Sequence, residues 1–466
     1  MEIRAWVHEE ARELPVLADV DVLVCGGGPA GTAAAIASAR SGSKTLLLER
    51  HGFLGGMATA GLVVPHWDSH QNGGVNADVI DRLGSRGGWG AEGWKISFDP
   101  ELWKHVSEDL VLDSGSDLLY HTFVVGTLRA GRAVKGVVIE TKSGRFAVLA
   151  RVVVDCTGDG DVAARAGAHF EKGRDDGLMQ PMTTMFRLGG VTWVQRRNAE
   201  LRDLIEQAIE RTGDEYRLPY DYPWAIHLPN PGEVAVMLVH VRDVDGTDVR
   251  DLTRAEIDGR RQTLAVVDFL RRHVAEFADA HLIETAPQVG VRETRRITGE
   301  YVLTGDDVAS GRSFEDAVAT VSFPADIHEP AGTGQVGFRV GSGPVRRGRY
   351  DIPYRALIPR DIDQLVVAGR CISGTFEAHA SYRVKGPCMA MGQAAGVAAS
   401  LSASSGVAPR DLAVRDLRRA LLEQNVKLDT DSTDVRDWRW ETVENDPTYR
   451  PDRGTMRQLS AYHGPG

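Results

Sequence analysis

The sequence of 466 residues lacks the cysteine patterns of several protein classes. It contains four cysteines, Cys25, Cys156, Cys371 and Cys388, and no two of them form a CxxC pair. Neither a zinc knuckle nor a dithiol redox pair is therefore indicated, and we expect no metal site. We interpret the four cysteines as small residues of the protein interior.

Long apolar and long basic segments are also missing. Without a run of about 18 apolar residues, the sequence predicts no transmembrane helix and no membrane partner. The first residues, MEIRAWVHEEARELPV, are charged throughout and lack the apolar centre of a secretory signal, so a cytoplasmic location is expected. The formal net charge of -11, without a Lys/Arg cluster, argues against a nucleic-acid partner. A few local arginines can still bind an anionic small molecule.

The N-terminal part contains a clear βαβ pattern. Residues 21–25 form a short apolar run followed by glycines, which is typical of a buried parallel strand. Residues 29–40 are rich in alanine and predict a helix that lies close to the sheet. A second strand is predicted over residues 45–49. Together these segments make a βαβ unit of about 30 residues.

The following segments extend this unit. Asp99 and Pro100 predict a helix start, with Asp99 as N-cap and Pro100 at the first helical position. Strand-like patterns over 134–139, 146–149 and 152–155 predict a β-meander.

The later part of the chain predicts an inserted domain. Residues from about 170 to 345 alternate strands and helices without a glycine-rich phosphate signal, and loop signals cluster at 324–348. One helix is predicted from the spacing of Val267, Leu270, Val274 and Phe277. A buried strand returns at 365–369, and a helix of small residues follows from Pro387 to about Ser400.

We therefore predict an α/β fold with a Rossmann-like nucleotide-binding domain, made of a parallel sheet plus a β-meander, and an inserted α+β substrate domain. The length supports more than one domain. The expected ranges are 1–170 and 346–430 for the two parts of the nucleotide-binding domain, 171–345 for the insertion, and 431–466 for a C-terminal tail. Whether identical chains associate is left open.

The sequence GGGPAG at residues 26–31 fits GxGxxG directly after a strand and before a helix. Gly26 permits the tight turn, Gly28 lets the backbone approach a pyrophosphate, and Gly31 lets the helix pack on the strand. The free N–H groups of the helix start attract the phosphates. This loop predicts a dinucleotide site, which NAD or FAD could occupy.

Acidic and glycine-rich strand ends refine this prediction. Glu49 ends the second strand, where a carboxylate accepts hydrogen bonds from ribose hydroxyls and repels a 2′-phosphate. Glycine segments also occur at 55–56, at the strand end at 155–161, and at 367–370. Such segments, spread along the chain, suit one extended dinucleotide that crosses the sheet edge. They favour FAD over NAD.

With these motifs the sequence resembles the FAD-dependent oxidoreductases of the glutathione-reductase-type superfamily. More closely, it resembles a bacterial branch distantly related to the flavoproteins of succinate dehydrogenase and fumarate reductase. The matching motifs are GGGPAG with Glu49, FLGGMAT, DCTGDGD, GVRETRRITGEYVLTGDD, YDIPYRALIP and VAGRCISGTFEAHASYRVKGPCMAMGQAAG. The resemblance covers about residues 18–405 and implies FAD as cofactor, but it does not name a substrate.

The resemblance implies a set of FAD-binding residues. These are Gly26, Gly28, Pro29, Ala30, Gly31, Glu49, Arg50, Gly55, Gly56, Met57, Thr59, Val124, Thr157, Gly158, Gly369, Arg370, Gly386 and Pro387. Many relatives have an acidic residue at the position of Arg370, where it meets the ribityl hydroxyls, so this contact is in doubt here. Gly386 and Pro387 are expected to open the last helix, whose N-terminus would stabilise negative charge on the reduced flavin.

Four side chains are candidates for substrate chemistry. Arg292 lies with Arg295 and Arg296 in a segment that could clamp a carboxylate or form salt bridges with Glu293 and Glu300. His379 or His328 could carry a proton near neutral pH, with His328 expected in a loop. Arg383 is the fourth candidate.

The leading hypothesis is an FAD-dependent oxidoreductase that transfers a hydride between flavin N5 and a small polar or carboxylated substrate. No second glycine-rich βαβ motif is visible, so the electron acceptor or donor is expected to be external: oxygen, a quinone or another protein. One alternative is a flavin-binding scaffold or sensor without redox turnover. A second is a tRNA-modifying flavoprotein, against which the acidic charge argues.

Overall fold

The computed structural model describes residues 5–69, 72–91, 94–192, 198–212, 219–220, 223–332, 335–337 and 349–428. The predicted tail at 431–466 lies outside these residues. The four cysteines are free and buried, as expected of small interior residues. Among the described residues, no helix combines the length and the apolar character that crossing a membrane requires.

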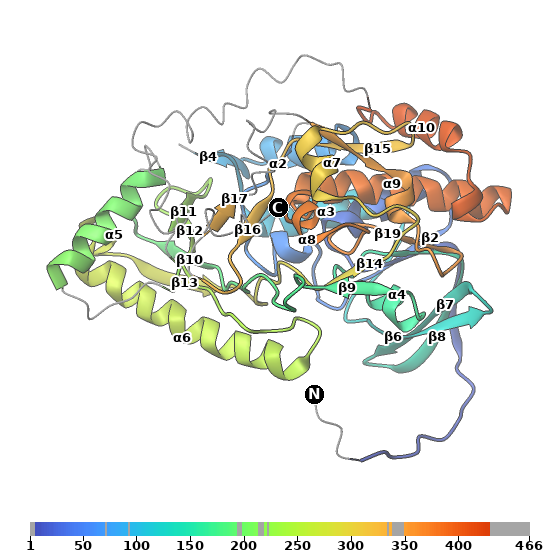
Figure 1. Cartoon of the computed structure of the whole chain (residues 1–466), viewed down its shortest axis with the longest axis horizontal. Coiled ribbons are helices and arrows are strands. Elements are labelled where there is room, and N and C mark those ends of the chain that lie inside the picture. The colour runs from blue at the N-terminus through green and yellow to red at the C-terminus, as the bar shows by residue number, and fades with distance from the viewer. Residues whose placement is uncertain are drawn as a thin grey trace, which may run out of the picture.

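A parallel sheet forms the centre of the fold (Figure 1). Its strands are β5 (Asp117–Leu119), β2 (Thr45–Leu48), β1 (Val16–Cys25), β8 (Gly144–Asp155) and β19 (Leu365–Val367). All four neighbouring pairs run parallel, which brings β19 from late in the chain beside β8. This arrangement is the Rossmann-like α/β fold that the sequence predicts, with carboxyl ends of strands from both halves of the chain at one edge.

The β-meander consists of β6 (Phe123–Ala130), β7 (Ala133–Thr141) and β8, paired antiparallel. The prediction of two strands over 146–149 and 152–155 is wrong, because β8 is continuous. Its first half pairs with β7 and β1, and its last residues pair with β1 and β19. Arg151, which lies between the two predicted segments, is an exposed side chain in an otherwise buried stretch.

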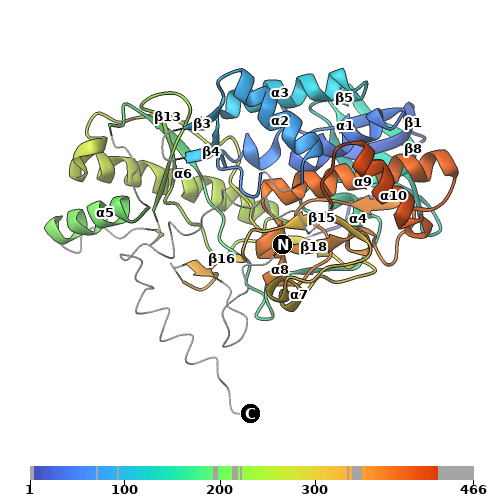
Figure 2. The same ribbon diagram turned by 90° about the horizontal axis from the view of Figure 1, so that it is seen from above.

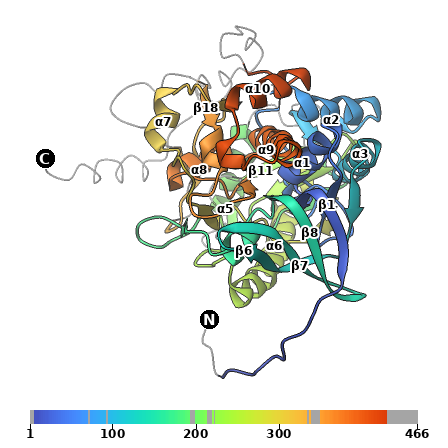
Figure 3. The same cartoon turned by 90° about the vertical axis from the view of Figure 1, so that its right-hand side faces the viewer.

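Two helices of small residues, α1 (Pro29–Arg40) and α9 (Lys385–Ser405), lie side by side against this sheet (Figure 3). A Cβ atom at Gly392 or Gly396 would overlap the carbonyl oxygens of Ala30 or Ala34. These glycines therefore let the two backbones approach closely. The helix at the beginning of the dinucleotide loop is thereby fixed to the helix at the end of the domain.

Two expectations for α9 are wrong. The helix begins at Lys385 with Val384 as N-cap, so Pro387 is its third residue and not its first. The first turn of a helix donates no internal hydrogen bonds, so proline is tolerated there as well. Helix α10 (Val414–Glu423) follows, so α9 is not the last helix.

Helices α2 (Gly74–Ser85) and α3 (Pro100–Asp113) lie close together (Figure 2). Asp99 caps α3 as predicted, because its carboxylate accepts hydrogen bonds from the amides of Glu101 and Leu102. A small hairpin of β3 (Trp89–Ala91) and β4 (Trp94–Phe98) leads into this helix.

A second hydrophobic core lies to the left in Figure 1. Its antiparallel sheet has the order β11-β12-β10-β13, with bounds Trp224–His227, Val234–Met237, Phe186–Gly189 and His281–Thr285. Helices α5 (Asn198–Thr212) and α6 (Val249–His273) pack with this sheet. The helical spacing of Val267 and Leu270 is confirmed, but α6 ends before Val274, and Phe277 lies in the short 3-10 turn Ala275–Phe277.

The chain between the second core and α9 returns to the main core. This part contains β14 (Arg295–Ile297), α7 (Gly305–Ser310), β15 (Ala317–Val321), β16 (Asp326–His328), β17 (Gln335–Gly337), β18 (Tyr350–Pro353) and α8 (Phe376–Tyr382). β14 pairs with β9 (Phe170–Lys172), and β15 pairs with β18. β15 packs against α9, and its side chains belong to the main hydrophobic core. The predicted domain boundaries stay a prediction.

Candidate functional site

The loop between β1 and α1 is shaped by two glycines that admit no side chain. Gly26 has a φ of +99°, and a Cβ atom there would lie 2.5 Å from the carbonyl oxygen of Cys156. A Cβ atom at Gly31 would overlap the carbonyl oxygen of Gly26. Both glycines are therefore required by the close approach of the loop to β8 and to itself.

Gly28 is different, because a Cβ atom there would meet only the Cα of Gly56, at 3.8 Å. No packing contact within the described chain requires glycine at this position. The start of α1 next to it has no side-chain cap and no acidic residue in its first turn. Its free amides and positive dipole end therefore adjoin open space, which is what a bound pyrophosphate needs. Pro29, Ala30 and Gly31 form that first turn.

Glu49 is buried at the end of β2, and both of its carboxylate oxygens accept backbone hydrogen bonds. One oxygen accepts from the amide of Gly27 at 2.6 Å, and the other accepts from the amide of His51 at 2.8 Å. Each oxygen keeps a second lone pair, so a ribose hydroxyl can still bind. Val124 lies on β6 near this position, since the amide of Thr122 donates to the carbonyl of Glu49 at 3.0 Å.

Gly55 and Gly56 pack directly against the loop between β1 and α1. The amide of Gly55 donates to the carbonyl of Gly27 at 2.8 Å, and a Cβ atom at Gly56 would lie 2.8 Å from the Cα of Gly28. Met57 follows in the short 3-10 turn Gly56–Ala58. The hydroxyl of Thr59 donates to the carbonyl of Leu54 at 2.7 Å, so it holds the turn. Arg50 donates to Gln288, at 2.5 Å, from an exposed position.

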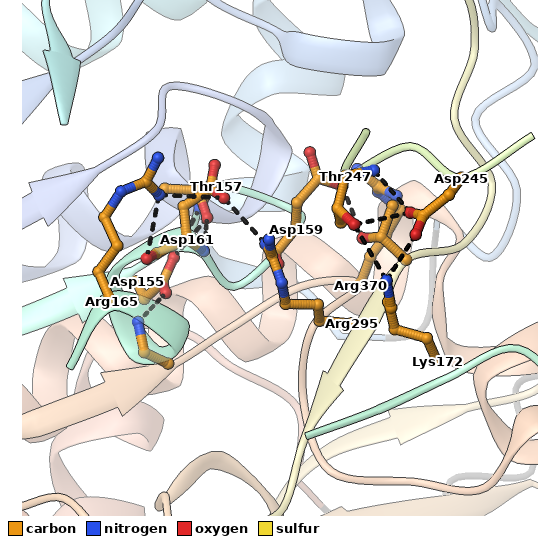
Figure 4. Close-up of polar contacts among 12 residues, drawn as sticks. Asp155, Thr157, Asp159, Asp161, Arg165, Lys172, Asp245, Thr247, Arg295 and Arg370 are labelled. Atoms are coloured by element: carbon orange, nitrogen blue, oxygen red, sulfur yellow. Dashed lines mark hydrogen bonds and ion pairs between the residues drawn. The ribbon is translucent and has the colours of Figure 1, made fainter. Parts of the chain in front are cut away.

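The segment after β8 is held by Asp155, which sequence reasoning did not single out (Figure 4). Its carboxylate accepts from the amide and hydroxyl of Thr157, at 3.0 and 2.7 Å, and from the amide of Ala163 at 2.9 Å. Burial raises the pKa of Asp155. Gly158, at φ +80°, makes room for the guanidinium of Arg370, which a Cβ atom would meet at 2.7 Å.

Arg370 forms an ion pair with Asp159 at 3.0 Å, drawn in Figure 4. Its other terminal nitrogen, Nη1, is buried and has no hydrogen-bond partner in the described structure. Gly369, at φ +93°, lies against Ala30, because a Cβ atom would be 3.1 Å from the Cβ of that residue. Arg370 therefore lies beside the start of α1 with one nitrogen available.

These observations fit an FAD molecule. A dinucleotide needs an uncapped helix start, a backbone path without side chains, and donors for its phosphates. The start of α1, Gly28 with Gly56, and the unpartnered Nη1 of Arg370 supply these features.

The start of α9 packs closely on the segment before α2. A Cβ atom at Gly386 would overlap the carbonyl oxygen of Asp68, so backbone contact explains this glycine. Pro387 is buried in the same turn. The ammonium of Lys385 donates to the carbonyls of Val63 and Pro65, at 2.7 and 2.8 Å. Burial lowers the pKa of Lys385 to about 7.

The four side chains predicted for substrate chemistry are buried in one region. Arg383 donates to the carboxylate of Asp326 at 3.2 Å, and His328 lies 3.4 Å from the same oxygen. Arg383 also lowers the pKa of Arg292 and of His379 by charge repulsion. His328 ends strand β16, so its expected place in a loop is wrong.

Arg292 is buried without a carboxylate partner. It donates to the carbonyl of Pro181 and to the hydroxyl of Thr183, both at 2.6 Å, and contacts the sulfur of Met237 at 3.4 Å. It forms no ion pair within the described part of the chain. Burial and Arg383 lower the pKa of Arg292 to about 10, so the side chain is charged at neutral pH.

His379 lies on α8 and is buried near the guanidinium groups of other segments. Its Nδ1 atom has no hydrogen-bond partner among the described residues. Burial, followed by repulsion from Arg296, Arg383 and Arg370, lowers the pKa of His379 far below its usual value. The imidazole is therefore neutral at pH 7.

The two neighbours of Arg292 form ion pairs. Arg296 contacts Glu293 at 2.5 Å, which is one of the salt bridges that the sequence left open. Burial raises the pKa of Glu293 to about 7. Arg295 contacts Asp161 at 2.9 Å beside the β8 segment (Figure 4). Glu300 contacts Arg410 and not one of these arginines.

Sequence reasoning missed His240, Tyr220 and Asp326. Nε2 of His240 lies 3.2 Å from Nδ1 of His328, and the ring of Tyr220 lies 3.9 Å from that of His240. The flanking sequence, VMLVHVRD, is typical of a core strand and carries no functional signal. We call the assembled group the arginine–histidine cluster; it comprises Arg292, Arg296, Arg370, Arg383, His240, His328, His379 and the carboxylates of Asp159, Glu293 and Asp326.

Comparisons with known proteins found similar chains. Thiamine thiazole synthase from Methanococcus vannielii is 31% identical over 182 residues, which cover 35% of this chain and 65% of that protein. A geranylgeranyl bacteriochlorophyll reductase-like protein from Thermoplasma acidophilum has a similar structure, with a TM-score of 0.42, 12% identity, and coverage of 87% and 84% of the two chains. A flavoprotein/dehydrogenase from Cytophaga hutchinsonii gives a TM-score of 0.44 with 15% identity, covering 83% and 79%.

The family described as FAD dependent oxidoreductase matches residues 21–421, which is most of the chain. The matched range begins at β1 and ends within α10, and it includes the glycine loop, the Asp155 segment and Arg370. The chain therefore belongs to the family of FAD-dependent oxidoreductases, and FAD is its cofactor.

Proposed function

We propose that this enzyme transfers a hydride between flavin N5 and a small carboxylated substrate held by the arginine–histidine cluster. FAD supplies the two-electron chemistry when it is bound. The residues of the chain bind the substrate carboxylate, exclude water and accept or return the proton that accompanies the hydride. The cluster includes Arg370, which also lies beside the start of α1, and this supports a substrate position next to the FAD site.

The observation that carries this proposal is a surplus of buried positive charge. Three arginines of the cluster are paired with carboxylates: Arg296 with Glu293, Arg370 with Asp159, and Arg383 with Asp326. Arg292 has no such partner among the described residues, although it is buried. An uncompensated buried charge is strongly unfavourable, so a bound anion is the expected partner of Arg292. A carboxylate suits a guanidinium best, because the two groups are both planar and can form paired hydrogen bonds.

Unpartnered nitrogen atoms of the cluster support the same conclusion. Apart from Nη1 of Arg370, which faces the proposed FAD site, Nε of Arg383, Nδ1 of His379 and Nδ1 of His240 are buried and lack hydrogen-bond partners in the described structure. Buried polar atoms in native proteins are almost always paired, so three exceptions in one cluster favour a ligand there. The proton carrier is then a neutral histidine of this cluster.

The proposal is tested by anaerobic mixing of the FAD-loaded enzyme with a panel of small carboxylic acids. Oxidised enzyme is screened for loss of flavin absorbance, and photoreduced enzyme for its return. We expect at least one acid to change the flavin redox state, and Arg292→Met to abolish the change while FAD stays bound. The matched control is Arg261→Met, which removes the same charge from an exposed position on α6. Equal responses of both variants would refute the role of Arg292.

We also propose a more distant family relationship and an external partner for electron transfer. The GGGPAG loop with Glu49 supports a relationship to the glutathione-reductase-type and succinate dehydrogenase flavoproteins. An external electron acceptor or donor, namely oxygen, a quinone or another protein, would complete the cycle. Stopped-flow reoxidation of reduced enzyme by oxygen and by a soluble quinone distinguishes the first two from a protein partner.

A further inference from the structure

Two buried histidines and the partly buried Asp326 form a continuous series of close polar contacts beside Arg292. Oδ2 of Asp326 lies 3.4 Å from Nε2 of His328, and Nδ1 of His328 lies 3.2 Å from Nε2 of His240. The exposed fractions are 2% for His328 and 3% for His240. The far nitrogen of His240, Nδ1, is buried and has no hydrogen-bond partner among the described residues.

The carboxylate of Asp326, at one end of this series, determines which nitrogen atoms of the two histidines carry hydrogen. Asp326 also accepts a hydrogen bond from Arg383 at 3.2 Å, which favours its ionised form. An ionised Asp326 can only accept, so Nε2 of His328 carries a hydrogen and its Nδ1 is a lone pair. That lone pair requires a hydrogen on Nε2 of His240. The remaining nitrogen of His240, Nδ1, is then a lone pair without a donor, which is the form of a general base.

Burial lowers the pKa of His240 well below its usual value, as it does for His379, but the charged groups around the two rings differ. Three guanidinium groups, Arg296, Arg370 and Arg383, oppose a proton on His379. A proton on His240 is instead linked through His328 to the carboxylate of Asp326. A His–carboxylate pair stabilises the imidazolium that forms during proton transfer.

The groups that face His240 explain how a substrate would complete this base. Besides His328 on β16 they are Arg292, before β14, Arg242, on its own segment, and Tyr220, whose ring lies tilted against the imidazole. Burial opposes a charge on His240 most strongly, and repulsion from Arg292, His328 and Arg242 follows. A carboxylate bound to Arg292 would neutralise the largest of these three charge effects.

We propose that Asp326, His328 and His240 form a proton relay, in which Nδ1 of His240 accepts the proton of a 2-hydroxy or 2-amino acid. The inference rests on the proposed function and names its substrate class. During oxidation the C–H bond breaks and its electron pair leaves as hydride to FAD. The O–H or N–H bond breaks at the same time, its electron pair forms the C=O or C=N bond, and the proton binds His240. His240 is the catalytic residue, and His328 and Asp326 are positioning residues.

The relay is tested first without a substrate, by nitrogen NMR of the holoenzyme labelled with ¹⁵N-histidine. The His240 signals are assigned by their loss in His240→Asn. We expect His240 and His328 each to be neutral at pH 7 and to carry hydrogen on Nε2 alone. In His328→Leu the His240 signal should change to a mixture of both tautomers, whereas His105→Leu, at an exposed position on α3, should leave it unchanged. A hydrogen on Nδ1 of His240 in the wild type, or an unchanged tautomer in His328→Leu, overturns the relay.

A second measurement separates the relay from the proposed function, with acetate as the probe. Acetate bound to Arg292 should raise the pH at which His240 takes up a proton, and Arg292→Met should remove this shift. Expected tautomers without any acetate shift would overturn the carboxylate site of the proposed function while leaving the relay intact. A shift that appears without the expected tautomers would overturn the relay alone.

Some 2-hydroxy or 2-amino acids are expected to reduce the flavin of the holoenzyme. With each of these acids, the His240→Asn substitution should slow flavin reduction by about 10²- to 10⁴-fold, the usual contribution of a general base. The rate in wild type should follow one ionisation, which His328→Leu shifts and which His105→Leu, at an exposed position on α3, does not. If the flavin of the His240→Asn variant is reduced at the wild-type rate, His240 is not the base.

Discussion

Replacement of Gly28 by alanine should weaken FAD binding without unfolding the protein. The added methyl group meets only the Cα of Gly56, at 3.8 Å, so the chain itself has room for it. The backbone of Gly28 is extended, with φ -69° and ψ -176°, which alanine adopts without strain. The stability of the FAD-free protein should therefore change by no more than about 1 kcal/mol, the range of such N-cap and glycine effects.

The same methyl group would occupy the space that the pyrophosphate needs. Forcing one extra carbon into a filled site costs about 1–3 kcal/mol. At 1.4 kcal/mol per factor of ten, the dissociation constant of FAD should rise about 5- to 150-fold. Gly31→Ala should behave differently, because its methyl group overlaps the carbonyl of Gly26 and disturbs the fold itself.

Urea unfolding of the FAD-free protein gives its free energy of unfolding. Quenching of flavin fluorescence on titration gives the dissociation constant of FAD. Gly84→Ala is the matched control, since Gly84 lies within α2 and a Cβ atom there would project into open space. It should raise stability by up to about 1 kcal/mol and leave FAD binding unchanged. A wild-type dissociation constant in Gly28→Ala would refute the assignment of the pyrophosphate to this loop.

Three further predictions concern packing and protonation. Gly392→Ala should lower the free energy of unfolding by about 1–3 kcal/mol in urea, because its methyl group overlaps a carbonyl of α1. Asp155→Asn should lower it by about 1–3 kcal/mol and weaken FAD binding in the fluorescence titration, because a buried amide cannot accept all three hydrogen bonds. Lys385 has its pKa lowered to about 7, so between pH 7 and about 10 the unfolded chain binds more protons than the native protein. The free energy of unfolding should therefore rise with pH over this window, and Lys385→Met should flatten the rise. Equal slopes of the free energy of unfolding against pH in wild type and in Lys385→Met would contradict the lowered pKa of Lys385.

The local signals in the sequence predicted the nucleotide-binding half well. Helix α1 has the predicted bounds, because Gly28 and Pro29 mark its start unambiguously. The start of α9 could not be predicted in the same way. Val384 gives no capping signal, and Lys385 is held by carbonyls of Val63 and Pro65, more than 300 residues earlier in the chain. Such contacts leave no trace in a local pattern.

The candidate substrate site was predicted only in part. Arg292, His328, His379 and Arg383 were chosen for their residue types, and tertiary structure brings them into one cluster. His240 was not found, because a histidine between valines on a buried segment is ordinarily interpreted as part of the core. Its contact with His328 joins segments 88 residues apart. The role of Arg292 depends on a missing ion pair, which only the packed structure reveals.

The central claim is that FAD and a carboxylate occupy adjacent sites at Gly28 and at Arg292. A crystal structure of the FAD-loaded enzyme, grown with acetate or with a substrate acid, tests it most directly. We predict the pyrophosphate on the backbone of Gly28 and a carboxylate within hydrogen-bond distance of the Arg292 guanidinium. FAD bound away from this loop, or Arg292 still contacting only Pro181, Thr183 and Met237, would contradict the account.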